Sequence, residues 1–171
     1  MKPTNIEIKA KCKNKEKIRK ILESNKAVFK GTDHQIDTYF KVSLGRLKLR
    51  EGNIENNLIY YERENKSGPK QSNIILLKSN PNSNLKELLT KSIGILTIVD
   101  KSREIFFIDN VKFHIDTVKN LGDFIEIEAI DNEENIGIQK IQEQCNNFKK
   151  LLDIKDADLI SDSYSDLILK T

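Results

Sequence analysis

The strongest local pattern in the chain is Asn5-Ile-Glu-Ile-Lys-Ala-Lys11. Polar and aliphatic residues alternate strictly along it, which is the pattern of a β-strand whose two faces differ in chemistry. Such a strand either lies in an open sheet with its charged face in water or forms the wall of a closed barrel. The other strands of the chain must distinguish these alternatives.

The same separation of charged and aliphatic faces recurs in at least four other segments. They are Arg46–Arg50, Lys101–Arg103, His114–Asp116 and Glu126–Glu128. In a sandwich, these faces would be the wet outer surfaces of two sheets. In a barrel covered by helices, the apolar faces would point outward and the charged faces would line the bore.

The sequence predicts about eight strands, mostly joined by turns of hairpin length. They cover residues 5–11, 37–41, 46–50, 58–63, 72–78, 95–109, 111–118 and 124–130. Three amphipathic helices are predicted as well: one after Asn14, one over residues 85–93, and one that begins within 132–135 and ends near Leu152. Three helices need apolar surface to cover, which favours the barrel over the sandwich. A short element around Tyr164 is expected to dock back on the body.

Length and composition predict one soluble domain spanning residues 1–171. The chain is 37% hydrophobic and 32% charged, and it has no apolar run near the ~20 residues of a membrane span. A net charge of +3, interspersed along the chain, gives no reason to expect specific nucleic-acid binding. Cys12 and Cys145 lie far apart without metal-ligand spacing, so a reduced, cytoplasmic protein is expected.

A bore lined by charge is costly unless a ligand neutralises it. Phosphate oxygens match lysine and arginine, whereas Mg²⁺ or Mn²⁺ matches glutamate and aspartate. The charged faces therefore predict a ligand that combines phosphate with a divalent metal ion.

Seven motifs in order along the chain resemble the CYTH superfamily, also called the triphosphate tunnel metalloenzymes. They are Asn5-Ile-Glu-Ile-Lys9, Gly45-Arg-Leu-Lys-Leu-Arg-Glu51, Tyr60-Tyr-Glu-Arg63, Ser67-Gly-Pro-Lys70, Lys101-Ser-Arg103, His114-Ile-Asp116 and Leu121-Gly-Asp-Phe-Ile-Glu-Ile-Glu128. The resemblance runs from about residue 3 to residue 168 and looks closest to the bacterial branch similar to class IV adenylate cyclases. It implies an α+β fold, namely a closed eight-stranded antiparallel β-barrel that forms a tunnel, with helices packed outside.

The resemblance also implies roles for individual residues. The expected metal ligands are Glu7, Glu126 and Glu128, with Asp116 as a further candidate. The expected triphosphate clamp is Lys9, Lys11, Lys48, Arg50, Arg63, Lys70, Lys101 and Arg103, and the candidate catalytic residues are Lys9, Tyr39 and Arg50. Taken singly, each charged residue would be an ordinary surface group, and His34 and His114 are expected to be structural.

One position departs from the family pattern. The signature of the family is Glu-x-Glu-x-Lys, and this chain has Asn5 at the first glutamate. Asparagine offers a carbonyl oxygen as ligand but lacks the charge, so the number and identity of the metal ions stay open.

Three functions follow as hypotheses. The leading one is a class IV adenylate cyclase, which converts ATP to cyclic AMP and pyrophosphate with Mg²⁺ or Mn²⁺. The alternative is a triphosphatase that hydrolyses tripolyphosphate, thiamine triphosphate or a nucleoside triphosphate. The third is a module that binds nucleotide or polyphosphate without turnover, and a homodimer remains open in each case.

Overall fold

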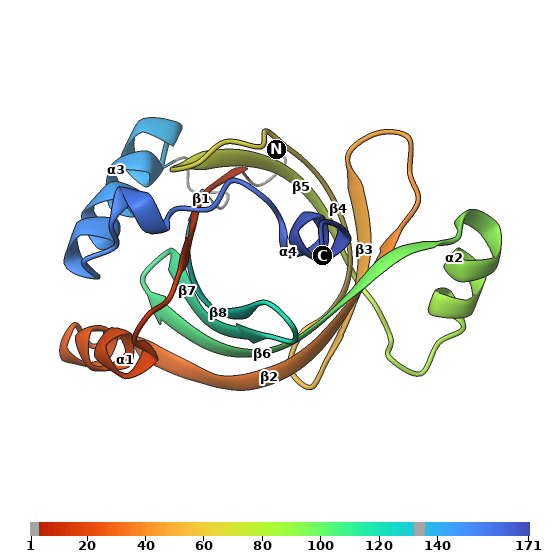
Figure 1. Ribbon diagram of the computed structural model, residues 1–171, viewed down its shortest axis with the longest axis horizontal. Coiled ribbons are helices and arrows are strands. Elements are labelled where there is room, and N and C mark those ends of the chain that lie inside the picture. The colour runs from red at the N-terminus through yellow and green to blue at the C-terminus, as the bar shows by residue number, and fades with distance from the viewer. Residues whose placement is uncertain (1–3, 132–135) are drawn as a thin grey trace.

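The protein is described by a computed structural model that covers residues 4–131 and 136–171 (Figure 1). In this part of the chain, eight antiparallel strands close into a barrel in the order β1-β5-β4-β3-β2-β6-β7-β8. The strands are β1 (Thr4–Lys11), β2 (Val28–Phe40), β3 (Arg46–Gly52), β4 (Asn56–Arg63), β5 (Lys70–Lys78), β6 (Ile95–Ile108), β7 (Val111–Val118) and β8 (Gly122–Asp131). The α-helices are α1 (Lys15–Ser24), α2 (Leu85–Ile93), α3 (Ile138–Leu151) and α4 (Tyr164–Leu169), and a short 3₁₀ turn covers Asp156–Asp158. The predicted closed barrel with external helices is confirmed.

The polar face of β1 points into the barrel. β1 pairs with β8 so that Glu7 lies opposite Glu128 and Lys9 lies opposite Glu126. Asn5 and Lys9 are buried, although both are polar. β1 is therefore part of a tunnel wall, with its polar face turned to the bore.

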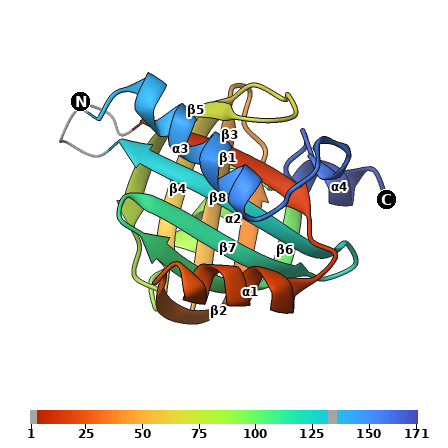
Figure 2. The same ribbon diagram turned by 90° about the vertical axis from the view of Figure 1, so that its left-hand side faces the viewer.

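The main apolar core lies between the barrel and its outer helices. Residues on the outer faces of β1, β7 and β8, such as Ile8, Phe113 and Ile127, are fully buried. Leu22 of α1 and Cys145 of α3 belong to the same cluster, and Figure 2 shows these two helices lying across those strands. The period-2 alternation thus sends aliphatic groups outward to the helices and charged groups inward.

The second strand is longer than predicted. Residues 37–41 were expected as a strand after a break at Gly31 and Asp33, whereas β2 runs without interruption from Val28 to Phe40. The expectation was wrong because a β-bulge next to Gly31, whose φ is +129°, absorbs the irregularity without ending the strand. The Asp33 carboxylate turns inward and accepts hydrogen bonds from the backbone N–H groups of Ile54 and Glu55.

Two predictions concern the C-terminal third. The predicted start of the third helix, within 132–135, lies outside the described residues, and α3 itself covers Ile138–Leu151. The tail docks on the barrel as expected, since the N–H of Ile160 donates to the carbonyl of Lys9. α4 then lies across one end of the bore (Figure 1). None of the helices in the described ranges is long and apolar enough to cross a membrane.

The location of the core leads to a stability prediction. Ile127 and Ile75 both point outward from barrel strands, but Ile127 is 0% exposed beneath helices and Ile75 is 50% exposed. Ile127→Ala should lower the free energy of unfolding by about 2–5 kcal/mol, because it leaves a cavity in packed surroundings. Ile75→Ala should change it by less than about 1 kcal/mol. Urea unfolding measures both, and equal losses would contradict the assignment of the core.

Candidate active site

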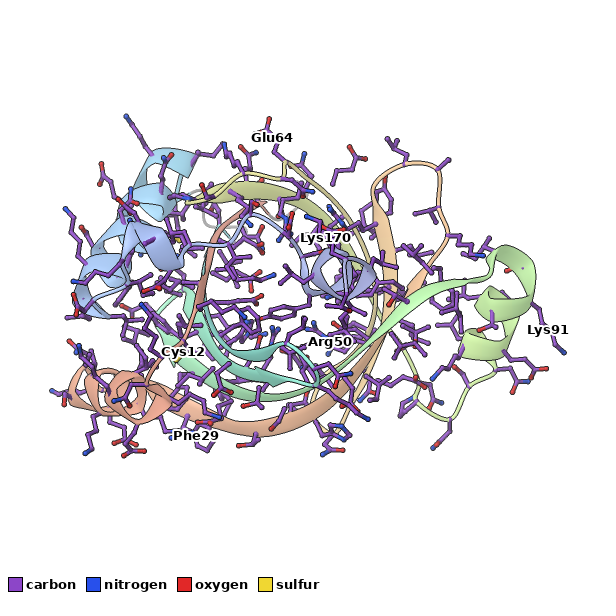
Figure 3. All side chains as sticks on the ribbon, in the orientation of Figure 1. Cys12, Phe29, Arg50, Glu64, Lys91 and Lys170 are labelled. Atoms are coloured by element: carbon purple, nitrogen blue, oxygen red, sulfur yellow. The ribbon has the colours of Figure 1, made fainter. Side chains whose placement is uncertain are left out.

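Seven lysine and arginine side chains line one pocket inside the barrel. They come from five strands and are Lys9, Lys48, Arg50, Arg63, Lys101, Arg103 and Lys112. Figure 3 shows the bore filled with side chains, with Arg50 directed into it. The sequence predicted six of these seven residues as a triphosphate clamp, and the structure brings those six together. The same pocket is lined by Glu7, Glu126 and Glu128.

Asp37 organises three of these cations from the inner face of β2. Its carboxylate accepts hydrogen bonds from Lys48 at 2.9 Å, Lys101 at 2.7 Å, and two nitrogens of Arg50 at 2.9 Å each. Burial would raise the pKa of Asp37, but the charges of Arg50, Lys101 and Lys48 outweigh it and hold that pKa well below its usual range. Burial lowers the pKa of Lys101 to about 7, although Asp37 opposes this shift. One carboxylate thus fixes three groups that come from two separate strands, β3 and β6.

A second cluster joins the tail to the barrel. Arg103 donates to both oxygens of Asp116, at 2.7 and 2.5 Å, and to Glu126 at 2.9 Å. The hydroxyl of Tyr164, from α4, donates to Asp116 at 2.6 Å. The ammonium of Lys9 lies 4.0 Å from the centre of the Tyr164 ring and 3.3 Å from Glu126. Asp116 was a candidate metal ligand, but in this structure both of its oxygens are engaged by Arg103 and Tyr164.

His114 lines the pocket between these groups. Its Nδ1 lies 3.2 Å from Glu126, and burial lowers the pKa of the imidazole to about 4, with the charge of Arg103 acting in the same direction. The ring is therefore neutral near pH 7. Its structural role stays a prediction.

The three glutamates offer hard oxygen donors on two paired strands. The described residues hold no preformed group of three or more histidine, cysteine, aspartate or glutamate side chains around one point. The donors nevertheless fit a divalent cation in type and place. Burial raises the pKa of Glu128, and the nearby Glu7 carboxylate adds to this shift while Lys112 opposes it. Two facing carboxylates that repel each other suit a divalent cation.

Asn5 stands beside this carboxylate pair. Its side-chain nitrogen donates to Glu128, and its Oδ1 is buried with no partner among residues 4–131 and 136–171. An unpartnered buried oxygen is unfavourable unless a ligand or water satisfies it. The amide therefore keeps one oxygen available to a cation, as the sequence suggested, but adds no charge.

Arg63 is the cation with the least complete set of partners. One terminal nitrogen donates to Glu7, whereas Nε and Nη2 are buried and find no acceptor in the described part of the chain. Guanidinium donors form a planar fork that suits two oxygens of a phosphate or carboxylate. Arg63 is thus prepared for an anion that belongs to a ligand.

Two predicted clamp residues lie outside the pocket lining. Lys11 is exposed and donates to the carbonyl of Leu121 at 3.0 Å. Lys70 is fully buried and donates to the tail carbonyls of Ile160 and Ser161, at 3.0 and 2.9 Å. Lys70, expected in the clamp, begins β5 and holds the tail in place.

Tyr39 faces the pocket, as expected. The structure places its hydroxyl 3.4 Å from the ammonium of Lys48, and the aromatic ring beside Lys9 is that of Tyr164. Burial raises the pKa of Tyr39 to about 12, and the Asp37 charge contributes to this shift. The phenol is therefore protonated at neutral pH.

Sequence reasoning missed several pocket residues. Asp37 lies beneath the pocket cations and was missed as well; it lay two residues before Tyr39 in a predicted strand, so their shared face was an available signal. Lys112 alternates in the same way with His114. Glu55 lies in a turn and carried no signal of this kind. Tyr164 shares a helical face with Leu167 and Ile168, but this local pattern does not specify a contact with the bore.

The Asp37 cluster gives a second prediction. Asp37→Asn should lower the free energy of unfolding by about 3–5 kcal/mol, since it leaves three buried cations without their shared anion. Asp100→Asn is the matched control, because Asp100 pairs with an exposed His34 and should change stability by less than about 1 kcal/mol. Denaturant unfolding at low salt compares the two. Similar small losses in both variants would show that Asp37 does not hold the cluster.

Three comparisons place this architecture among known proteins. A candidate adenylate cyclase from Vibrio parahaemolyticus superposes with a TM-score of 0.73 at 16% identity, covering 99% of each chain. Pfu-838710-001 from Pyrococcus furiosus gives a TM-score of 0.78 at 22% identity over 95% of this chain and 99% of that one. HpAC1 from Hippeastrum, a candidate adenylyl cyclase with a dominant triphosphatase activity, gives 0.61 at 13% identity, covering 96% of this chain and 94% of its own.

At these identities the superpositions show the fold alone. A comparison with curated proteins finds no match. The family model of the CYTH domain, however, matches residues 3–164, which is nearly the whole chain. This chain therefore belongs to the CYTH domain family.

Proposed function

We propose that this protein is a divalent-metal-dependent enzyme that acts on a triphosphate inside its barrel, with ATP converted to cyclic AMP and pyrophosphate as the leading reaction. The observation that carries the proposal is the Arg63 side chain, whose Nε and Nη2 are buried without an acceptor beside six other cations. A polyanion satisfies all of these donors at once. Membership of the CYTH family supports the same substrate class.

The proposed clamp is organised before substrate arrives. Lys48, Arg50 and Lys101 are held by Asp37, so they need little reorganisation to meet a phosphate chain. Arg50 also reaches Glu55 at 2.9 Å, and Lys112 contacts the same carboxylate. Phosphate oxygens would take the place of Glu55 on these two cations.

The metal site proposed for Mg²⁺ or Mn²⁺ consists of Glu7, Glu126 and Glu128, with the oxygen of Asn5 as a further donor. A bound divalent ion supplies Lewis-acid activation of the attacking oxygen and charge neutralisation on the phosphates. Arg63 now neutralises Glu7, so moving this guanidinium to a phosphate would free the carboxylate for the cation. The residues of the chain thereby couple the phosphate site to the metal site.

In the cyclase reaction, the ribose 3′ oxygen forms a bond to the α-phosphorus and its proton passes to water. The bond between the α-phosphorus and the oxygen that bridges to the β-phosphorus breaks, and pyrophosphate leaves with that oxygen. Charge accumulates on the leaving pyrophosphate. We assign Lys9 and Arg50 to stabilise it, because both are buried cations of the same pocket. Preformed donors in a site that excludes water are the strongest source of such stabilisation.

The second candidate is hydrolysis of a triphosphate, and the Lys48–Tyr39 contact favours it. A lysine and tyrosine that face the same pocket resemble the pair that helps to activate water in triphosphatases of this family. Because the pKa of Tyr39 is about 12, this phenol would orient water as a neutral group and would not remove its proton. Both candidates use the same clamp.

The setting is proposed to be cytoplasmic, with residues 1–171 acting as one domain. Cys12 and Cys145 are both free thiols in the structure. Free cysteines are the norm in reducing compartments.

Product analysis is the third prediction. Incubation of the protein with ATP and Mg²⁺ or Mn²⁺ should yield cyclic AMP and pyrophosphate, and chelation by EDTA should abolish the reaction. Parallel incubations with tripolyphosphate and thiamine triphosphate test the hydrolase, which releases orthophosphate. Tight binding of these compounds with no product in any of them would favour a binding module over both enzymes.

Variants of the clamp provide the control for this experiment. Arg50→Ala and Lys101→Ala should each reduce turnover by about 10²–10³-fold, as loss of a preorganised donor does elsewhere. Lys91→Ala, an exposed change on α2, should leave turnover unaltered. The clamp assignment fails if both bore variants bind and turn over substrate like the unchanged protein.

The fourth prediction concerns the departure from the family signature. Asn5→Glu adds a carboxylate next to Glu7 and Glu128, so the affinity for Mn²⁺ should rise by about tenfold. Calorimetric titration of the metal-free protein measures this affinity. Asn73→Glu, on the exposed outer face of β5, adds the same charge away from the bore and should have no effect. A weaker or unchanged affinity in Asn5→Glu would show that the metal ion does not bind beside Asn5.

A further inference from the structure

The inner wall of the barrel is chemically uneven. β1, β3, β6, β7 and β8 contribute nearly all of the charged lining, whereas the middle of β4 and β5 contributes Ile59, Tyr61, Ile74 and Leu76. The strand register places Ile59 opposite Leu76 and Tyr61 opposite Ile74. These four side chains therefore form one continuous apolar patch on the pocket wall, called here the β4–β5 wall.

Part of this wall is uncovered. Leu76 points into the pocket, yet it is 53% exposed, and Ile74 is only partly buried. An inorganic chain of phosphates would gain nothing from an aliphatic surface and would leave it in contact with water or charge. An organic group placed against it would bury apolar area, which stabilises the complex by about 25 cal/mol for each Å² removed from water.

The position of the wall suits the base of a nucleotide, the part away from its terminal phosphate. β5 starts at Lys70, which is bound to the tail, and Leu76 lies six residues further along, or roughly 20 Å at the rise of a strand. The wall therefore extends toward the end of the barrel away from the tail. On β3, Lys48 pairs with Ile59 and Arg50 pairs with Asn57, so phosphate-binding cations directly border the wall.

Polar groups at the edge of the wall suit a heterocyclic ring. Asn57 lines the pocket beside Ile59 on β4, and its amide carries both a donor and an acceptor. Ser72 lies two residues before Ile74 on the same face of β5, and its buried hydroxyl has no partner in the described ranges. Pockets for organic ligands characteristically combine an apolar surface with a few such polar groups.

Resting on the proposed function, we propose that the β4–β5 wall binds the base of a nucleoside triphosphate. The base would lie flat against Ile59, Ile74 and Leu76, with its polar edge toward Asn57, while the triphosphate reaches Lys48 and Arg50. The wall makes this protein selective for nucleotides over inorganic tripolyphosphate.

Binding measurements on two adjacent leucine variants test this selectivity. Leu76→Asn replaces the inward leucine by a polar side chain of similar shape, and Leu77→Asn makes the same change on the outward, 61% exposed neighbour. Calorimetric titration with ATP and with tripolyphosphate in EDTA gives affinities in the absence of metal-dependent turnover. We expect Leu76→Asn to bind ATP about tenfold more weakly and tripolyphosphate unchanged, and Leu77→Asn to match the unchanged protein for both.

The alternative outcomes are distinct. If Leu76→Asn leaves ATP affinity unaltered, or weakens ATP and tripolyphosphate equally, the base does not lie on the wall and the inference is overturned. If the unchanged protein binds neither compound, the proposed triphosphate site itself fails. Because both variants alter positions that are half exposed or more, equal urea midpoints should confirm that differences in binding do not come from unfolding.

Discussion

Seven cationic side chains point into a closed barrel, and the structure depends on how their charge is compensated there. A side chain on the inner face of a barrel cannot turn to bulk water, so its charge must be met by a neighbour. Asp37 forms ion pairs with Lys48, Arg50 and Lys101, and Asp116 forms one with Arg103. These pairs make the inward placement of charge tolerable. The aliphatic residues that alternate with them are consequently directed outward, where α1 and α3 cover them.

Buried ion pairs of this kind add little to stability compared with an apolar core, because desolvation offsets much of their attraction. Their consequence is geometric. Carboxylates carried on rigid strands hold lysine and arginine groups at fixed positions before any ligand binds, and such preorganisation is what makes donors effective toward a developing anion. Glu55, which lies in the turn before β4, pairs with Arg50 and Lys112. In the proposed complex a phosphate chain would take its place, whereas Asp37 and Asp116 would keep their cations.

Much of this architecture could be predicted from the sequence, because successive side chains of a β-strand point to opposite faces. The alternation at Glu7 and Lys9, at Lys48 and Arg50, and at Lys101 and Arg103 identified the inward residues correctly. The length of β2 was missed, since a bulge at Gly31 hides the continuity of the strand. The tail contacts were missed for another reason. Lys70 meets Ile160 across 90 residues of sequence, and no local pattern specifies such a partner.

The tail makes the two ends of the bore different. Tyr164 fills the space beside Lys9 and Asp116 at one end, and Lys70 and Lys9 hold the backbone there. The opposite end carries Lys112, Glu55 and the half-exposed Leu76. A ligand with a charged part and an apolar part therefore meets two different environments along one axis. In the proposed complex, the phosphates of a nucleoside triphosphate would meet the cations of the bore, Arg50 and Lys112 among them, and the base would cover the aliphatic wall beside them. Tripolyphosphate has no apolar part and would leave that wall uncovered. The difference between the two ligands therefore lies in the aliphatic wall, since the cations of the bore would serve both.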